Sequence, residues 1–247
     1  MKTLITLILS IAAISAFSQP KGIKCIYAST MQVKKSFYDI ENPIVRDTII
    51  QRTKQDRKVY SLTISDNKSL FKKEPESVDK MPLLTDTRNI YIDFNDSSRI
   101  TQTEHGGKMY IIKDKANTLE WEISPETEIV LGRTCYKATL KGNNKITAWF
   151  TPDVPMVCGP LGYYGLPGLV VRIKIPVYTL DLQSITETDN PEMNIPKEGE
   201  LITEDAYKAN ANKTYKELLN SAKKSNLLRI NQQHFTEGCP LSGYVFL

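Results

Sequence analysis

Residues 132–173 have the sequence GRTCYKATLKGNNKITAWFTPDVPMVCGPLGYYGLPGLVVRI, and this stretch decides the expected fold. Apolar and polar residues alternate on both sides of the Gly142-Asn143-Asn144 turn, which is typical of a hairpin over residues 133–151. Two more strands are expected over 169–175 and 178–185, joined by a short connection. Such connections favour antiparallel pairing, because parallel neighbours need a long crossover.

The sequence on either side of this stretch is also β-rich. Alternating apolar residues predict strands at 23–31, 60–64 and 119–123, and strand-like alternation dominates up to about residue 187. Residues 72–89 combine charged residues with two prolines and are expected to form a loop, or a short helix at most. Residues 189–200 are polar and contain prolines, which indicates a linker.

One helix is predicted near the C-terminus. Thr203 is suited to cap it, and Glu204 and Asp205 in the first turn favour the positive helix end. Apolar residues then recur at three- and four-residue spacing up to Lys223: Tyr207, Ala211, Tyr215, Leu218, Leu219 and Ala222. This stripe predicts a helix laid on the sheet, with its aromatic residues in the core. The expected fold class is therefore mainly β (α+β), a single-domain curved antiparallel sheet or half-barrel with a C-terminal helix packed on it.

Residues 1–18 have the pattern of a secretory signal peptide. Lys2 precedes an apolar run that is too short to span a bilayer, and small residues near its end favour cleavage before Gln19. Residues 19–247 would then form one β-rich domain without a transmembrane segment. A core helix at the N-terminus is the alternative. The favoured interpretation predicts export to the periplasm, the outer membrane or the extracellular space.

The charge balance argues against a nucleic-acid partner. The chain has 32 Lys and Arg residues against 28 Asp and Glu residues, for a net charge of +4. The lysines are scattered among acidic residues, whereas a phosphate-binding surface needs clustered positive charge.

The residues Tyr164-Gly165-Leu166-Pro167-Gly168-Leu169-Val170 resemble the signature of the GLPGLI family of exported bacterial envelope proteins. The agreement extends to Cys135-x-x-Ala138, to Ala148-Trp149-Phe150-Thr151-Pro152 and to Gly159-Pro160. The resemblance implies an exported, β-rich protein. Because the family has no established biochemical activity, the resemblance supplies no catalytic residues.

Turn chemistry accounts for the glycine and proline of this signature. Pro167 presets the backbone for the second position of a turn and Gly168 accepts a positive φ at the third, so a type II turn is expected from Leu166 to Leu169. Tyr163 and Tyr164 form a candidate ligand loop beside it. The alternative, which we favour, is a corner that packs these side chains into the core. The glycines fit no phosphate-binding pattern.

Four cysteines in an exported chain indicate two disulfides, with three connectivities open. We favour Cys135–Cys158, because the expected hairpin returns the chain toward Cys135, and this leaves Cys25–Cys239 as the second pair. A zinc site is disfavoured, since only His234 and Cys239 approach the spacing of metal ligands.

The sequence carries no catalytic template. It lacks G-x-S-x-G, H-E-x-x-H and S-x-x-K, and it contains only two histidines. His105 follows Glu104 in a Gly-rich turn, where a solvated imidazole is expected. Glu120 and Glu122 alternate on the polar side of a strand, so they are expected to face water. No catalytic, cofactor or metal residue is predicted.

These observations favour a non-enzymatic binding or interaction protein of the Gram-negative envelope, without a cofactor. If the sheet encloses an apolar cavity, the partner is an apolar or lipid-like small molecule. If the interior is filled, the chain is a structural partner of an envelope assembly. An enzyme without a recognisable motif is the remaining alternative.

Overall fold

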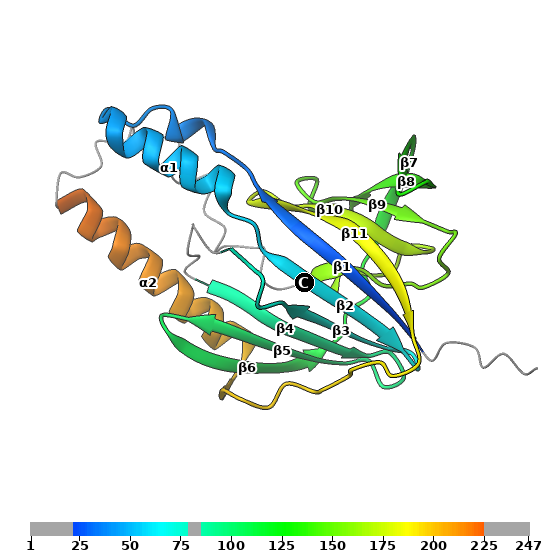
Figure 1. Ribbon diagram of the computed structural model, residues 1–247. Helices are drawn as coiled ribbons and strands as arrows, with labels where there is room; N and C mark the ends of the chain where they lie inside the picture. Colours follow the sequence, from blue (N-terminus) through cyan, green and yellow to red (C-terminus); the bar gives the residue numbers. More distant parts are fainter. Residues whose placement is uncertain (1–21, 79–84, 225–247) are drawn as a thin grey trace, which may run out of the picture.

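The structure is a computed structural model that describes residues 22–78 and 85–224 (Figure 1). Twelve strands form one sheet in the order β12-β6-β5-β4-β3-β2-β1-β11-β10-β9-β8-β7. The strands are β1 (Gly22–Met31), β2 (Val59–Ser65), β3 (Lys68–Lys73), β4 (Thr85–Asp93), β5 (Ser98–His105), β6 (Lys108–Lys115), β7 (Trp121–Val130), β8 (Arg133–Leu140), β9 (Thr147–Thr151), β10 (Leu169–Lys174), β11 (Tyr178–Thr188) and β12 (Glu200–Ile202). The helices are α1 (Pro43–Gln55), α2 (Glu204–Lys224) and the short 3-10 turns η1 (Lys35–Phe37) and η2 (Pro160–Gly162).

The predicted fold class is confirmed: the chain is mainly β, with a curved sheet and a C-terminal helix. All described strand pairs are antiparallel except β12–β6, which is parallel. This exception arises because residues 189–199 carry the chain along the sheet from β11 to the far edge (Figure 1). The Gln102 side-chain amide donates to Glu198 O at 2.7 Å, which attaches this connection to β5.

Tight turns set the register of three hairpins. Asp66-Asn67, Gly106-Gly107 and Leu131-Gly132 all have positive φ at both residues. This is the backbone of a type I′ turn, whose twist matches that of the strands it joins. The hairpin expected over 133–151 is also confirmed as β8 and β9.

Helix α1 was not expected from the sequence. The Asn42 side chain caps it by accepting from the backbone N–H groups of Ile44 and Val45, and Pro43 stands at its first position. Asparagine followed by proline is a recognised helix start. Only Ile50 and Thr53 are buried, so the helix has no broad apolar stripe to indicate it in the sequence.

The segment 72–89, expected to form a loop or a short helix, instead contributes to two strands. Strand β3 runs to Lys73 and β4 begins at Thr85, with residues 79–84 outside the described part. Strand β7 begins at Trp121, two residues later than the apolar alternation indicates, and continues to Val130.

Helix α2 matches the sequence prediction closely. The Thr203 hydroxyl caps it by accepting from Ala206 N–H at 3.2 Å, and Tyr207 and Ala211 are buried. The side chains of Tyr215, Leu218, Leu219 and Ala222 lie outside what the structure describes. Within the described residues, no helix is both long and apolar enough to cross a membrane.

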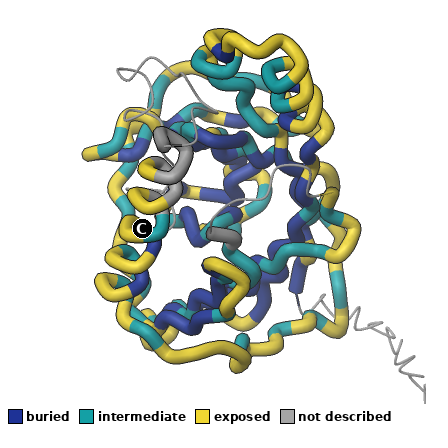
Figure 2. The backbone as a smooth tube through the Cα atoms, turned by 90° about the vertical axis from the view of Figure 1, so that its left-hand side faces the viewer, coloured by how far each residue is buried: buried dark blue, intermediate teal, exposed yellow. Residues whose placement is uncertain are grey.

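The core lies on the concave side of the sheet, where the buried parts of the backbone gather (Figure 2). Strands β1, β2 and β8–β11 direct apolar side chains to this side. The segment that contains η2 packs against β3 and β4 and adds Leu161 and Tyr163 to this core, whereas Tyr207 of α2 packs with Tyr110 and Ile112 of β6 in a separate small cluster.

Candidate functional site

A cleft of about 740 Å³ opens at the end of the sheet where β1 begins and β2 and β11 end, at the lower right of Figure 1. The register brings these ends together, because Gly22 lies opposite both Ser65 and Thr188. The loop after β9 forms the other wall with residues 153–158.

The floor of the cleft is apolar. Its side chains come from β1, β2, β11, the turn after β4, the 153–158 loop and the signature segment: Ile23, Ile64, Phe94, Val154, Met156, Ile185 and Tyr164. Because six segments distant in sequence supply these side chains, the cleft depends on the fold as a whole.

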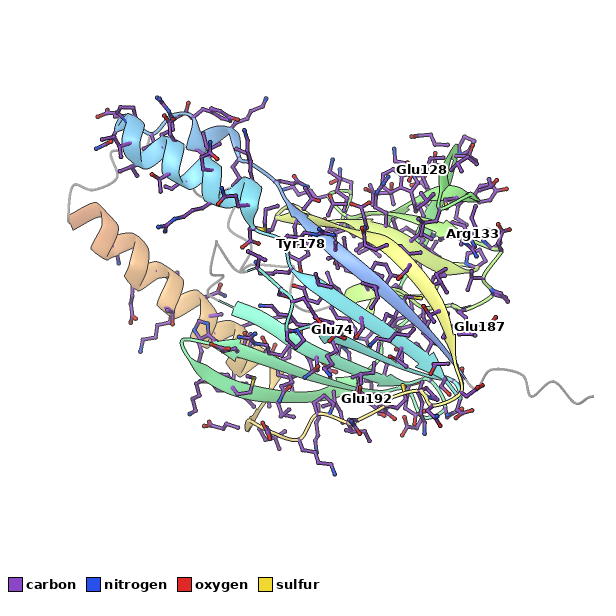
Figure 3. All side chains as sticks on the ribbon, in the orientation of Figure 1. Glu74, Glu128, Arg133, Tyr178, Glu187 and Glu192 are labelled. Atoms are coloured by element: carbon purple, nitrogen blue, oxygen red, sulfur yellow. The ribbon has the colours of Figure 1, made fainter. Side chains whose placement is uncertain are left out.

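Charged groups line the rim. Asp66, Asp153 and Glu187 are exposed carboxylates, and Arg133 is half-buried (Figure 3 labels Arg133 and Glu187). The Arg133 guanidinium donates to Leu131 O at 3.4 Å and makes no salt bridge with any described residue. The site thus combines an apolar interior with a rim that holds several carboxylates and Arg133, which has no salt-bridge partner within the described part of the chain.

Tyr164 lines the cleft and is fixed by three contacts. Its hydroxyl donates to Asn117 O, its ring packs edge-on against Phe94 with centroids 5.3 Å apart, and its carbonyl accepts from the Trp121 indole at 2.9 Å. Burial raises the pKa of Tyr164, while the charge of Arg99 partly opposes this shift. Tyr163, in contrast, is buried in the core and does not line the cleft. Of the two residues of the candidate ligand loop, Tyr164 lines the cleft and Tyr163 does not.

The expected type II turn is not present. Gly168 N–H donates to Leu166 O at 2.8 Å, which closes a three-residue inverse γ-turn around Pro167, and Leu169 N–H instead donates to Val154 O at 3.1 Å. Gly168 has φ of 147°, and a Cβ there would lie 2.1 Å from Thr151 O. The glycine is required mainly because the Thr151 backbone approaches it so closely. Of the signature residues 164–170, Tyr164 lines the cleft and the others do not.

The favoured disulfide between Cys135 and Cys158 is not formed. Cys25, Cys135 and Cys158 are buried free thiols, and Cys239 lies outside the described residues, as does His234. The charged neighbours of Cys135 are Glu128, Asp153 and Arg172. Arg172 and Ala28 both lie opposite Asp181 in the sheet, so the Arg172 side chain points to the face that Tyr27, next to Ala28, does not occupy. Because Cys158 packs on the Tyr27 side, the sheet separates it from Cys135.

The prediction of a solvated His105 is wrong. This residue is only 6% exposed, and its Nε2 lies 3.0 Å from the Thr214 hydroxyl on α2. The helix covers the end of β5 and so removes the imidazole from water. Glu120 and Glu122 are exposed, as expected, and Glu120 pairs with Lys141. Glu104 is half-buried and pairs with Arg88.

A buried polar cluster lies under α2, away from the cleft. Thr103 Oγ1 is 3.0 Å from the Tyr207 hydroxyl, and Arg99 Nε donates to Thr101 Oγ1 at 3.3 Å. Burial lowers the pKa of Arg99, and Asp114 partly opposes this shift. Burial also raises the pKa of Asp114. The cluster was missed because a strand of polar residues indicates a solvent-facing surface when the covering helix is unknown.

Among the described residues that line the cleft, Cys158 carries the thiol. Burial raises the pKa of Cys158 to about 12, which keeps the sulfur protonated at neutral pH. In the residues that the structure describes, no cluster of His, Cys, Asp and Glu could hold a metal ion. The residues missed at sequence level, Phe94 and Arg133 among them, carry no local signal, since only the strand register brings them to the cleft.

Comparisons with known proteins identify one family model. A model described as "Protein of unknown function (Porph_ging)" matches residues 140–172, within the stretch that carries the signature. No curated protein matches the sequence.

Two solved structures of PNGF-II, in space groups C2 and P21, are similar to the chain with TM-scores of 0.49 and 0.47 and identities of 15% and 14%. They cover 77% and 76% of this chain, which spans about a third of their length, 32% in each case.

Proposed function

We propose that the chain is an exported, GLPGLI-type protein of the Gram-negative envelope that binds an apolar or lipid-like small molecule in the cleft. The observation that carries this proposal is the cleft itself. Its volume falls within the range of about 300–1,000 Å³ that is usual for small-molecule sites. The signal-peptide pattern of residues 1–18 and the signature at 164–170 support export and family.

The distribution of polarity favours a ligand with an apolar body and a polar head. The body would lie on Ile23, Ile64 and Ile185, where each buried Å² of apolar surface contributes about 25 cal/mol. The head would remain at the rim, where Arg133 lacks a salt-bridge partner among the described residues. A guanidinium suits a carboxylate, which it can bind through two hydrogen bonds.

Titration with a dansyl-labelled undecanoic acid tests the proposal. The wild-type protein should bind the probe saturably, and Met156→Glu should weaken binding by about tenfold or more, because it places a carboxylate on the apolar floor. Ile195→Glu is the matched control, since Ile195 is exposed on the connection to β12 and lies away from the cleft. Equal affinity of both variants, or no saturable binding by wild type, would refute the cleft as the site.

Arg133→Gln tests whether Arg133 recognises the polar head of the ligand, independently of the binding of its apolar body. We expect it to weaken binding of the fatty acid while leaving binding of a neutral alcohol of the same length unchanged. Equal loss for both probes would show that Arg133 shapes the cleft without recognising the head group.

A structural role in an envelope assembly is favoured by a different observation, the sheet edge at β7, which pairs with β8 alone among the residues that the structure describes. This edge exposes Ile123 (51%), Ile129 (69%) and, in the adjoining turn, Leu131 (49%). An unpaired edge with exposed apolar side chains can accept a strand from a partner. A photo-crosslinker at Ile129 should then reach an envelope protein, whereas one at Ile195 should not.

A further inference from the structure

Cys25 lies on the concave side of β1, together with Tyr27. The β1–β2 register is unbroken from Gly22 to Ala28, so side chains alternate regularly along this part of β1. Both Cys25 and Tyr27 are fully buried. Their shared side faces the loop that follows β9.

Two hydrogen bonds place Cys158 against the same side. Val170 N–H donates to Cys158 O at 2.9 Å, and the Tyr27 hydroxyl donates to Val170 O at 2.7 Å. Cys158 also lines the cleft beside Ile185, which is the register partner of Cys25 on β11. Residues more than a hundred positions apart in sequence are thus brought into one small region.

The electrostatics agree with this placement. Burial raises the pKa of both thiols to about 12, and the nearby Cys158 adds to the shift at Cys25. Both sulfurs also contribute to the raised pKa of Tyr27. The two cysteines therefore lie within electrostatic reach of each other, whereas Cys135 interacts with a different set of groups.

We propose that Cys25 and Cys158 form a disulfide under oxidising conditions, which joins the first strand of the sheet to the wall of the cleft. This pairing replaces the one expected from sequence spacing. Formation of this bond in the cell rests on the export proposed above, because export would bring the chain into an oxidising compartment. Formation of the bond with an added oxidant does not depend on export.

The reaction is a two-step thiol–disulfide exchange with a low-molecular-weight disulfide such as oxidised glutathione. Cys158 is the first nucleophile, because it borders the cleft while Cys25 is inaccessible. Its thiolate attacks one glutathione sulfur, and the released glutathione thiolate takes up a proton. The Cys25 thiolate then attacks Cys158 Sγ in the mixed disulfide and releases the second glutathione. Two protein thiols are oxidised, and one glutathione disulfide is reduced to two thiols.

Non-reducing peptide mapping tests this pairing. The purified full chain is incubated with oxidised glutathione, remaining thiols are alkylated in denaturant, and the protein is digested with trypsin. Each cysteine falls in a different tryptic peptide, with bounds 25–34, 134–137, 146–172 and 230–247. Peptide 25–34 linked to 146–172 is the expected product. A link between 134–137 and 146–172, or alkylation of both Cys25 and Cys158, would overturn the proposal.

Variants provide the matched controls. Cys135→Ser should keep the 25–34 to 146–172 link, and Cys158→Ser should abolish it. Reductant should lower the Tm of the oxidised wild type but leave the Tm of Cys25→Ser unchanged, and an unchanged wild-type Tm would count against the bond. If the protein recovered from cells keeps residues 1–18 and remains in the cytoplasm, export is refuted. The disulfide pairing would still be decided by the experiment with oxidised glutathione in vitro.

Discussion

On the concave side of the sheet, strands β1 and β8–β11 present almost only apolar side chains, whereas β5 presents four polar ones under α2. We call the first region the apolar half; its fully buried residues include Ala138, Ala148, Ile173 and Leu180. We call the second region the polar half; it is formed by Arg99, Thr101, Thr103 and His105. Both regions are buried, but they are stabilised by different forces.

The difference predicts how each half responds to change. In the apolar half, stability comes from area removed from water and from close packing, so it is sensitive to any added volume. In the polar half, burial is unfavourable unless each donor and acceptor is paired, so it is sensitive to the loss of one hydrogen bond. The apolar half also supplies part of the cleft, with Ile23 of β1 and Ile185 of β11 among its lining residues.

Gly168→Ala should have the largest effect on stability, because Gly168 in the apolar half lies directly against the backbone of Thr151. The new Cβ would lie 2.1 Å from Thr151 O at a φ of 147°, so β9 and the signature segment must separate. We expect a loss of about 3 kcal/mol or more in the free energy of unfolding, measured by urea denaturation. Gly142→Ala is the control: φ is 80° there, but no atom lies within 4 Å, so only about 1 kcal/mol should be lost. Equal losses would show that φ, and not the close approach, requires the glycine.

Alkaline titration of the reduced protein should have the next largest effect when it is expressed per pH unit. Folding raises the pKa of Cys25 and Cys158 to about 12, so between the ordinary thiol pKa of about 9 and that value the unfolded chain releases two protons that the folded chain retains. Stability is therefore complete below about pH 9 and falls as pH rises, by up to about 2.7 kcal/mol per pH unit. The Cys25→Ala/Cys158→Ala double variant should show a much shallower decline. A parallel decline in both proteins would place the titrating groups elsewhere.

A mutant cycle at Thr103 and Tyr207 tests the polar half. Tyr207→Phe and Thr103→Val each remove one partner of the 3.0 Å hydrogen bond, and each should cost about 1 kcal/mol. The double variant should lose less stability than the two single variants together, because each single variant leaves one hydroxyl buried without this hydrogen bond and the double variant removes both hydroxyls. Thermal or urea unfolding of the four proteins measures the coupling. Strict additivity would mean that the polar half does not depend on this pairing.

The two halves also differ in how far their sequences predict them. The apolar half was predicted well, since Ala138 and Ala148 lie in strands with a clear period of two and a turn signal between them. His105 in the polar half was assigned to solvent because it lies beside the Gly106-Gly107 turn, and the residue of α2 that it contacts, Thr214, is more than a hundred positions away in sequence. The cleft was beyond sequence reasoning for another reason: Phe94, Arg133 and Ile185 meet only through the order of the strands. Asn42-Pro43 was a local signal for α1 that the sequence did contain.

The smallest effect is expected outside both halves, at the exposed pair Glu120 and Lys141. These side chains are 73% and 57% exposed, and Lys141 Nζ lies 3.3 Å from Glu120 Oε2. Water solvates both groups whether or not they pair, so Glu120→Gln should change the free energy of unfolding by no more than about 0.5 kcal/mol. Lys141→Gln should do the same, and added salt should leave wild type and both variants alike. A loss of 1 kcal/mol or more, measured by the same urea assay, would show that the edge at β7 and β8 contributes to stability as the two buried halves do.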